Sequence, residues 1–395
     1  MDFNQISKYV VGILLLPLTL RTARALWQNR QKAFDEDLTK ADRDLLKQTA
    51  VFVMLPLVVL FHECGHALAC YYFHLPITAV HWTLFWGEVQ YLGGTREAIE
   101  WTAAAGNLFQ LLAVILALLI AIISRSPAAV ALATYTYLWS AFSCLIFYPI
   151  VSLVAWRYDF AILYGNPDAR VVWAIACIHL VLAWLFIFTF LSTRTRLWFV
   201  KKTRPVWARE FAKTRAMAES EKTSVAYLAL AWQYYLVGLD TLAEKTLQLV
   251  QQIEPGNLDV WLLRGYIMQS QSKFETADFC FENIVKADPD RTLKARAYMA
   301  KGHCFYEKIL QAKKKDMTSV LNSYKQAVES ASELADPHYY LAIALKEGGQ
   351  LAASEAELQI CNNSQKNSLT WLDPVLANLA RNELINLRST FKEKK

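Results

Sequence analysis

Several common functional signatures are absent from this chain of 395 residues. Its seven cysteines contain no C-x-x-C pair and several lie in apolar stretches, which argues against a disulfide framework and against a cysteine-based zinc finger. Unpaired cysteines fit a reducing compartment. No phosphate-binding loop, Ser-His-Asp arrangement or dinucleotide fingerprint is evident, so a nucleotide-dependent enzyme and a serine hydrolase are both disfavoured.

Apolar residues, in contrast, are abundant. They make up 55% of the chain, and the mean hydropathy is +0.20. A soluble protein of this length rarely has a positive mean hydropathy, so the composition indicates a membrane protein. The net charge is +6, but the basic residues are clustered, which points to membrane topology and not to nucleic-acid binding.

Four apolar segments are long enough to cross the ~20-residue span of a hydrocarbon core. Because only a helix satisfies its own backbone hydrogen bonds there, each is predicted to be helical. A shorter apolar run at residues 9–20 predicts a short anchor or interfacial helix, since no small-x-small cleavage site follows it. The four long segments are residues 48–73, 98–123, 127–156 and 171–192.

Basic residues set the expected orientation. One cluster precedes the first long segment (residues 30–47) and another follows the fourth (residues 194–204), while the loops on the opposite side carry few basic residues. The positive-inside rule then makes both clusters, and the C-terminal half, cytoplasmic. The stretch 194–204 is interpreted as an anchor at the lipid surface.

Beyond residue 201 the pattern becomes that of a soluble helical repeat. Pro255 and Pro289 are 34 residues apart, and large and small residues recur around them at the same interval, which is typical of tetratricopeptide repeats. The matched pairs are Tyr227 with Trp261, Ala231 with Gly265, Ala243 with Ala277, Leu247 with Phe281, and Val250 with Val285.

Two further copies of the repeat are less regular. The third uses Gly302, Phe305, Tyr324 and Ala327 and carries a basic insertion at residues 313–315. The fourth uses Tyr340, Ala344 and Ala356. A capping helix is expected at residues 371–391. Three to four stacked helix pairs suffice to bury a solenoid core.

The first long segment contains the motif H-E-x-x-H. His62 and His66 are four residues apart, so on a helix both imidazoles lie on one face and can bind one metal ion. Glu63 lies about 100° around that helix, from where it can reach a metal-bound water. Three ionisable groups inside a membrane helix are costly unless they are paired or bind something, which favours a functional zinc site over a structural polar cluster.

A catalytic zinc usually has three protein ligands, so one is missing from the motif. Asp159, at the end of the third long segment, is the preferred candidate, because Pro149 should break or kink that helix and bring an acidic residue to membrane depth. An interfacial partner for Arg157 is the alternative role of Asp159. Asp168, in an Asn-Pro-Asp turn, is the second candidate ligand.

These residues resemble the site-2-protease family of intramembrane metalloproteases, peptidase family M50, over about the first 200 positions. The resemblance implies that His62, His66 and Asp159 bind Zn2+ and that Glu63 is the catalytic base. It also implies a strand-rich re-entrant segment at residues 87–94 that pairs with extended substrate. Residues 104–108 resemble the family's small-residue turn, so the substrate-binding residues implied are Glu88, Val89, Gln90, Tyr91 and Asn107.

The chain departs from this family at three points. Tyr148-Pro149 stands where the family has Asn-x-x-Pro, and Asp159 is followed by Phe160 and not by glycine. The expected topology also puts the zinc nearer the non-cytoplasmic side, whereas many family members have it nearer the cytoplasm. No PDZ domain is visible, and the repeats stand in its place.

Together these features predict an all-α protein: a polytopic transmembrane helical bundle followed by a soluble α-solenoid. The expected parts are an N-terminal anchor and basic linker (1–47), a metalloprotease-like domain (48–200), a linker helix (201–222) and the repeats (223–395). The expected function is that of a multi-pass zinc endopeptidase of a cell inner or organellar membrane. It would cleave a membrane-associated protein or peptide, and a protein partner would bind the cytoplasmic repeats.

Two other functions are weighed against the peptidase. The first alternative is a non-catalytic membrane scaffold that keeps a metal-binding motif. A metal transporter is a weaker alternative, since the ionisable residues form one site and not a relay.

Overall fold

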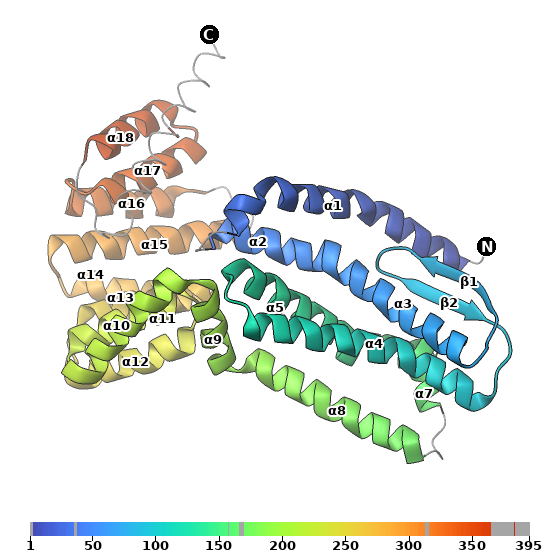
Figure 1. The fold of residues 1–395 in the computed structure, drawn as a ribbon. Helices are drawn as coiled ribbons and strands as arrows, with labels where there is room; N and C mark the ends of the chain where they lie inside the picture. The colour runs from blue at the N-terminus through green and yellow to red at the C-terminus, as the bar shows by residue number, and fades with distance from the viewer. Residues whose placement is uncertain are drawn as a thin grey trace, which may run out of the picture. The chain divides into compact units, whose positions relative to one another are not determined.

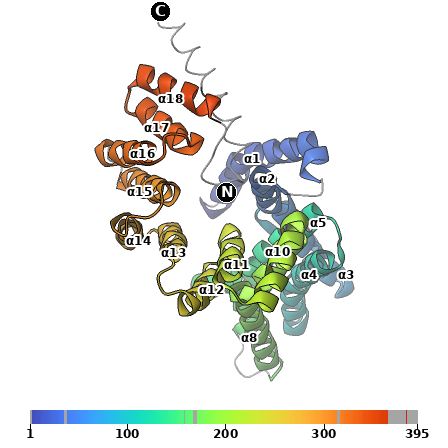
Figure 2. The same cartoon turned by 90° about the vertical axis from the view of Figure 1, so that its left-hand side faces the viewer.

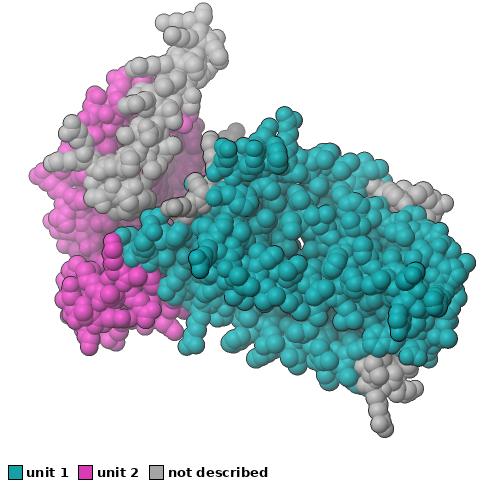
Figure 3. Space-filling model, in the orientation of Figure 1, with its two compact units in different colours: residues 1–210 teal, residues 211–395 magenta. Residues whose placement is uncertain are grey.

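The computed structural model describes residues 3–34, 38–156, 158–165, 170–312, 316–364 and 383. In these ranges the chain is helical except for one two-stranded sheet (Figure 1). It divides into two compact units, residues 1–210 and 211–395, with the boundary inside α10 (Pro205–Glu221) (Figure 3). The predicted basic insertion at 313–315, the capping helix at 371–391 (apart from Glu383) and Asp168 lie outside the described residues.

The first unit holds the apolar helices and the sheet. Its elements are α1 (Phe3–Ala33), α2 (Lys40–Thr49), the π-helical turn η1 (Ala50–Met54), α3 (Leu55–Tyr72), β1 (Ile77–Trp82), β2 (Gly87–Tyr91), α4 (Arg96–Ile123), α5 (Pro127–Phe142), the π-helical turn η2 (Ser143–Phe147), α6 (Tyr148–Ala155), α7 (Tyr158–Tyr164), α8 (Arg170–Leu191) and α9 (Thr193–Thr203).

The described residues include four helices long and apolar enough to cross a membrane. They coincide with the four apolar segments, whose helical structure is therefore confirmed. Small buried side chains such as Ala103, Ala128 and Ala141 lie at their contacts, where they allow helix backbones to approach closely. The outward surfaces carry large apolar residues. The four helices are Ala41–Tyr72, Arg96–Ile123, Pro127–Ala155 and Trp173–Leu191.

The N-terminal helix is longer than expected. The apolar run predicted a short helix, but α1 continues to Ala33. Apolar residues alone do not set its length, because the following segment is rich in good helix formers. Leu26 then packs against a cluster that includes Leu38 and Leu46, which anchors the second half of the helix.

The sheet lies between α3 and α4 in the sequence. β1 and β2 pair antiparallel, with Val80 opposite Val89 and His81 opposite Glu88. The strand at β2 agrees with the strand-rich segment that the family resemblance implied. β2 also packs against α3, and this contact brings the strand next to the H-E-x-x-H motif.

The second unit consists of helical hairpins stacked in a curved row (Figure 2). In the described residues each hairpin packs its two helices against one another, as the repeat predicted. After the C-terminal part of α10, the hairpins are α11 (Ser224–Leu236) with α12 (Asp240–Ile253), α13 (Leu258–Ser270) with α14 (Phe274–Lys286), α15 (Arg291–Ala312) with α16 (Thr318–Ser330), and α17 (Ala335–Glu347) with α18 (Leu351–Asn363).

Small and large residues meet inside the hairpins at the predicted positions. A Cβ added to Gly265 would collide with the ring of Phe281, and one added to Gly302 would collide with the ring of Tyr324. The second and third copies of the repeat therefore use the same close helix–helix contact, although the glycine and the ring are further apart in the sequence in the third copy.

Two details of the predicted repeat were wrong. Val250 was matched with Val285, which is 35 residues further on. Ile284 lies 34 residues after Val250 and takes the matching, fully buried position. In the fourth copy the contact between α17 and α18 is made by Ala342 and Ser354, whose hydroxyl donates a 2.7 Å hydrogen bond to the Ala342 carbonyl. Ala344 and Ala356, two residues further on, do not form this contact, and Ala356 is exposed.

Candidate metal centre

The polar face of α3 is formed by the H-E-x-x-H motif. His62, Glu63 and His66 are only 6%, 5% and 8% exposed. The Nδ1 atom of His66 lies 2.7 Å from the Thr102 carbonyl oxygen on α4 and can only donate to it. That hydrogen bond fixes the ring orientation and points Nε2 toward His62 and Asp159, as for a metal-binding histidine.

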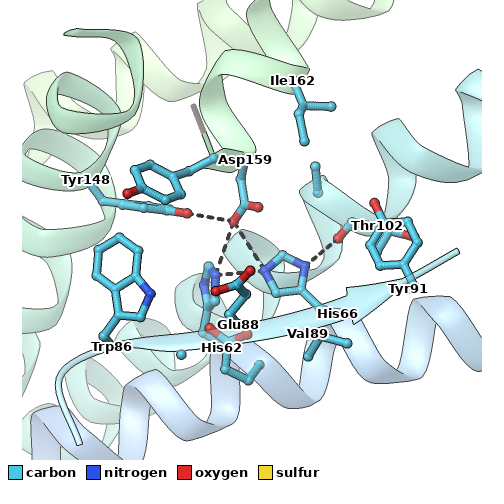
Figure 4. Close-up of a pocket in the computed structure, with 14 residues that line it drawn as sticks. His62, His66, Trp86, Glu88, Val89, Tyr91, Thr102, Tyr148, Asp159 and Ile162 are labelled. Atoms are coloured by element: carbon cyan, nitrogen blue, oxygen red, sulfur yellow. Dashed lines mark hydrogen bonds and ion pairs between the residues drawn. The ribbon is translucent and has the colours of Figure 1, made fainter. Parts of the chain in front are cut away.

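Asp159, on the short helix α7, completes a triangle of candidate ligand atoms. Its Oδ2 atom lies 3.1 Å from Nε2 of His62 and 3.2 Å from Nε2 of His66. The two imidazole nitrogens are themselves 2.9 Å apart. Figure 4 shows the three side chains pointing toward one another from two helices. The structure thus brings together the three residues predicted as metal ligands.

The spacing of these atoms fits a zinc ion. Ligands held at about 2.0–2.1 Å in a tetrahedron are about 3.3 Å from one another. The triangle has edges of 2.9, 3.1 and 3.2 Å, slightly shorter than this value. Two imidazoles and a carboxylate are also a common catalytic zinc donor set. A small outward adjustment of the side chains would therefore accommodate the ion.

Asp159 reaches the centre because the helix before it ends abruptly. α6 ends at Ala155, and Trp156 and Tyr158 then have the positive φ angles of 49° and 70°. The break predicted at Pro149 does not occur, since α5, η2 and α6 run as one helix through it, but the π-helical turn η2 distorts that helix directly before the proline. Pro149 gives no N–H to the preceding turn of this helix and lies shortly after the π-helical turn.

Two further side chains hold the Asp159 carboxylate. The Tyr148 hydroxyl donates to Oδ2 at 3.1 Å, and the Asn107 amide donates to the same atom at 3.3 Å. Asn107 was expected to bind substrate, which stays a prediction; the structure shows its amide on the candidate ligand Asp159. Its Oδ1 atom is buried and has no hydrogen-bond partner among the described residues.

Glu63 occupies the position of a proton acceptor. Its carboxylate lies in the same group as the two histidines, with ligand atoms all within 4.8 Å of one another. Oε2 is buried without a hydrogen-bond partner among the described residues. Asp159, whose oxygen contacts both imidazoles, is the better candidate for a third ligand than Glu63.

Glycines keep the space around these side chains open. A Cβ at Gly106 on α4 would collide with the His66 imidazole, and a Cβ at Gly87 on β2 would collide with the Glu63 carboxylate. The backbone of both elements therefore approaches the centre more closely than any other residue would allow. Gly106 belongs to the small-residue turn that the family resemblance singled out.

A pocket of about 200 Å³ opens onto the centre, with β2 forming one wall. Of the four strand residues expected to bind substrate, Glu88, Val89 and Tyr91 line it. Gln90 does not, and its amide donates to the Glu88 carboxylate at 3.0 Å. Only two strands form the sheet among the described residues, so β2 has a strand partner on one side only.

Sequence reasoning missed three residues of the site. Trp86 lines the pocket, Tyr148 holds Asp159, and Thr102 orients His66. None belongs to a local motif. The one available signal was that Tyr148 directly precedes Pro149, where the family has a different polar pattern.

Comparisons with known proteins give little further information. No family model and no curated protein matches the chain. Matching solved structures include the MamA RS-1 ArsTM double mutant (15% identity, covering 39% of this chain and 83% of that one, TM-score 0.30). PilF of Pseudomonas aeruginosa (14%, 51% and 95%, TM-score 0.33) and the APC/C hetero-tetramer Cut9–Hcn1 (11%, 86% and 72%, TM-score 0.33) also match. No conclusion about fold or function follows from likenesses this weak.

Proposed function

We propose that this chain is a zinc-dependent endopeptidase, similar to site-2 proteases, that cleaves a membrane-associated protein within or beside the bilayer. The observation that carries the proposal is the triangle formed by His62, His66 and Asp159. It lies beside the Glu63 carboxylate, whose Oε2 atom has no hydrogen-bond partner among the described residues, in a pocket walled by a strand.

Each side chain has a distinct role in this mechanism. His62, His66 and Asp159 would hold zinc, which when bound makes a coordinated water acidic and polarises the substrate carbonyl. Glu63 takes the proton of the attacking water and delivers it to the leaving nitrogen. Thr102, Tyr148 and Asn107 keep the ligands oriented through the hydrogen bonds described above.

The strand β2 supplies a surface for the substrate backbone. A peptide in a membrane helix has its carbonyls hydrogen-bonded internally and must unwind before it is cut. An extended segment can replace those hydrogen bonds by pairing with the side of β2 that has no strand partner. Glu88, Val89 and Tyr91 would then contact substrate side chains, and β2 would place the scissile bond close to Glu63.

The helical hairpins of the second unit provide a second binding surface. Stacked hairpins of this kind bind peptides and protein partners on their concave side. With the four long helices in a membrane, this unit would lie in the cytoplasm by the positive-inside rule. It would recruit the substrate or a regulatory partner to the peptidase.

Zinc content tests the metal site directly. Detergent-purified wild type should contain about one zinc per chain, and both His62→Ala and Asp159→Ala should lose it. Retention of zinc in Asp159→Ala would move the third ligand elsewhere. Glu63→Gln should keep zinc and stop processing of a co-expressed membrane substrate, whereas wild-type processing by this variant would refute the proposed catalytic role.

A non-catalytic scaffold is the second candidate. It is favoured by the array of hairpins, which needs no chemistry to assemble a complex, and by the absence of glycine after Asp159. Wild-type protein that contains no zinc after purification in chelator-free buffer, yet still binds the co-expressed membrane protein without cleaving it, would support the scaffold over the peptidase.

A further inference from the structure

A second cavity in the first unit lies apart from the metal centre and shares no lining residue with its pocket. It lies where α4, α5, α8 and α9 meet and has a volume of about 210 Å³. Its walls are mostly apolar, with Leu118, Leu138 and Phe190 among them, and they also carry Thr134, Arg196 and Trp198. The peptidase mechanism does not use this cavity.

One side of the cavity lies at the end of the apolar helices. The ammonium of Lys202 donates to the carbonyl oxygens of Ile122 at 3.0 Å and Ser124 at 3.2 Å, where α4 ends. The same ammonium is 5.9 Å from the centre of the Trp198 ring. Tryptophan and lysine at helix ends mark the level of lipid headgroups. The α9 side of the cavity is therefore placed at that level.

Two polar groups on the cavity wall, Thr134 and Arg196, can form further hydrogen bonds or ion pairs. The Thr134 hydroxyl is buried and has no hydrogen-bond partner among the described residues. Arg196 is exposed at the cavity, and none of the ion pairs found in the described part of the chain includes it. α9 carries four basic residues and no acidic one, so no carboxylate of its own helix can neutralise the guanidinium.

We propose that this cavity binds one anionic phospholipid, with its phosphate on Arg196 and part of an acyl chain among Leu118, Leu138 and Phe190. A guanidinium forms strong charge-assisted hydrogen bonds with a phosphate. A free phosphate would gain nothing from the apolar walls, and a zwitterionic lipid would bring a cation toward a basic helix. The proposal depends on the membrane placement given above but not on peptidase activity.

The test measures lipid binding to the full chain in detergent. Native mass spectrometry during titration with phosphatidylglycerol or phosphatidylcholine gives the affinity of each lipid. Wild type should prefer phosphatidylglycerol, and Arg196→Gln should weaken its binding about tenfold. Arg194→Gln is the matched control, because it removes the same charge from the same helix but does not line the cavity.

A variant of the apolar wall tests the acyl-chain part of the proposal. Leu118→Trp should fill the cavity and weaken binding of phosphatidylglycerol, with helix content checked by circular dichroism. Equal losses of phosphatidylglycerol affinity in Arg194→Gln and Arg196→Gln would show that only the overall positive charge of α9 matters, and would overturn the proposal. Equal binding of the two lipids to wild type would also overturn it. Zinc content should be the same in all three variants, so failure here and failure of the peptidase proposal are separable.

Discussion

The Nε2 atom of His179 lies 2.9 Å from the carbonyl oxygen of Leu145 and donates its hydrogen to it. Leu145 lies in the π-helical turn η2, shortly before Pro149, which has no N–H to donate to the preceding turn. The Nδ1 atom of the same imidazole accepts from the Tyr164 hydroxyl at 2.6 Å. His179 therefore joins α8 to both η2 and α7, and α7 is the helix that carries Asp159.

This relationship predicts a stability coupling between Pro149 and His179. His179→Phe should destabilise the first unit by about 1–3 kcal/mol, because it removes the hydrogen bonds to both the Leu145 carbonyl and the Tyr164 hydroxyl. In a Pro149→Ala background the restored N–H can reach that carbonyl, so the same substitution should cost less. Unfolding of all four proteins by denaturing detergent gives the double-mutant cycle. Additive effects of the two changes would contradict the coupling.

Asn107 is predicted to position the metal ligand Asp159. Asn107→Leu removes the donor to the carboxylate and should lower zinc affinity about tenfold or more, as the loss of other hydrogen bonds to metal ligands does. Competition with a chelator of known affinity measures the change. Thr136→Val, on α5 and outside the pockets lined by His62 and Glu63, is a suitable control. Unchanged zinc affinity in Asn107→Leu would argue against a positioning role.

Gly106 is predicted to be irreplaceable near the two imidazoles. Gly106→Ala places a methyl group against His66 and should reduce bound zinc well below one per chain, even if the protein remains folded. Gly256→Ala is the matched control, because no atom lies within 4 Å of the added Cβ. Metal analysis of both purified variants, with helix content from circular dichroism, tests this expectation. Full zinc occupancy in Gly106→Ala would show that the backbone of α4 can retreat from the site.

The second unit should show a pH-dependent stability at the α17–α18 hairpin. Burial lowers the pKa of His338, but the 2.5 Å contact with the Glu357 carboxylate, the Ser332 carbonyl and the charge of Asp336 together raise the pKa of the imidazole above the usual value. A raised pKa stabilises the fold fully below the unfolded-state value of about 6.5, and this stabilisation is lost as pH rises through the folded value.

Amide hydrogen exchange in α17 and α18 measures this effect. Protection in wild type, corrected for the intrinsic exchange rate, should be greater at pH 6 than at pH 8. Glu357→Gln should flatten the difference, since it removes the charge that favours the imidazolium. The comparison between the two proteins isolates His338 from the other histidines. An equal pH dependence in both would assign it elsewhere.

The sequence allowed the local parts of this structure to be predicted. His62 and His66 share a helix face because their spacing is four, and this relation needs no tertiary information. Asp159 could be selected because an acidic residue beside an apolar segment is rare and costly. The hairpins could be predicted because small and large residues recur every 34 positions.

The remaining features depend on packing between distant segments. Tyr148 and Thr102 reach the site only once α4, α6 and α7 are in place, so no local pattern marks them. The break before Asp159 comes from left-handed backbone at Trp156 and Tyr158, residue types that do not predict such angles. The positions within the fourth repeat were misassigned because the third copy is irregular, which removes the 34-residue reference for Ala342 and Ser354.

The contact between His62 and Asp159 joins positions 97 residues apart in the chain. A metal held by both would act as a reversible cross-link around a long loop that includes β1, β2, α4 and the helix from α5 to α6. The unfolded chain cannot keep these ligands together, so part of the binding free energy would appear as folding free energy. Zinc supply would then control the lifetime of the folded apolar unit in the cell as well as its peptidase activity.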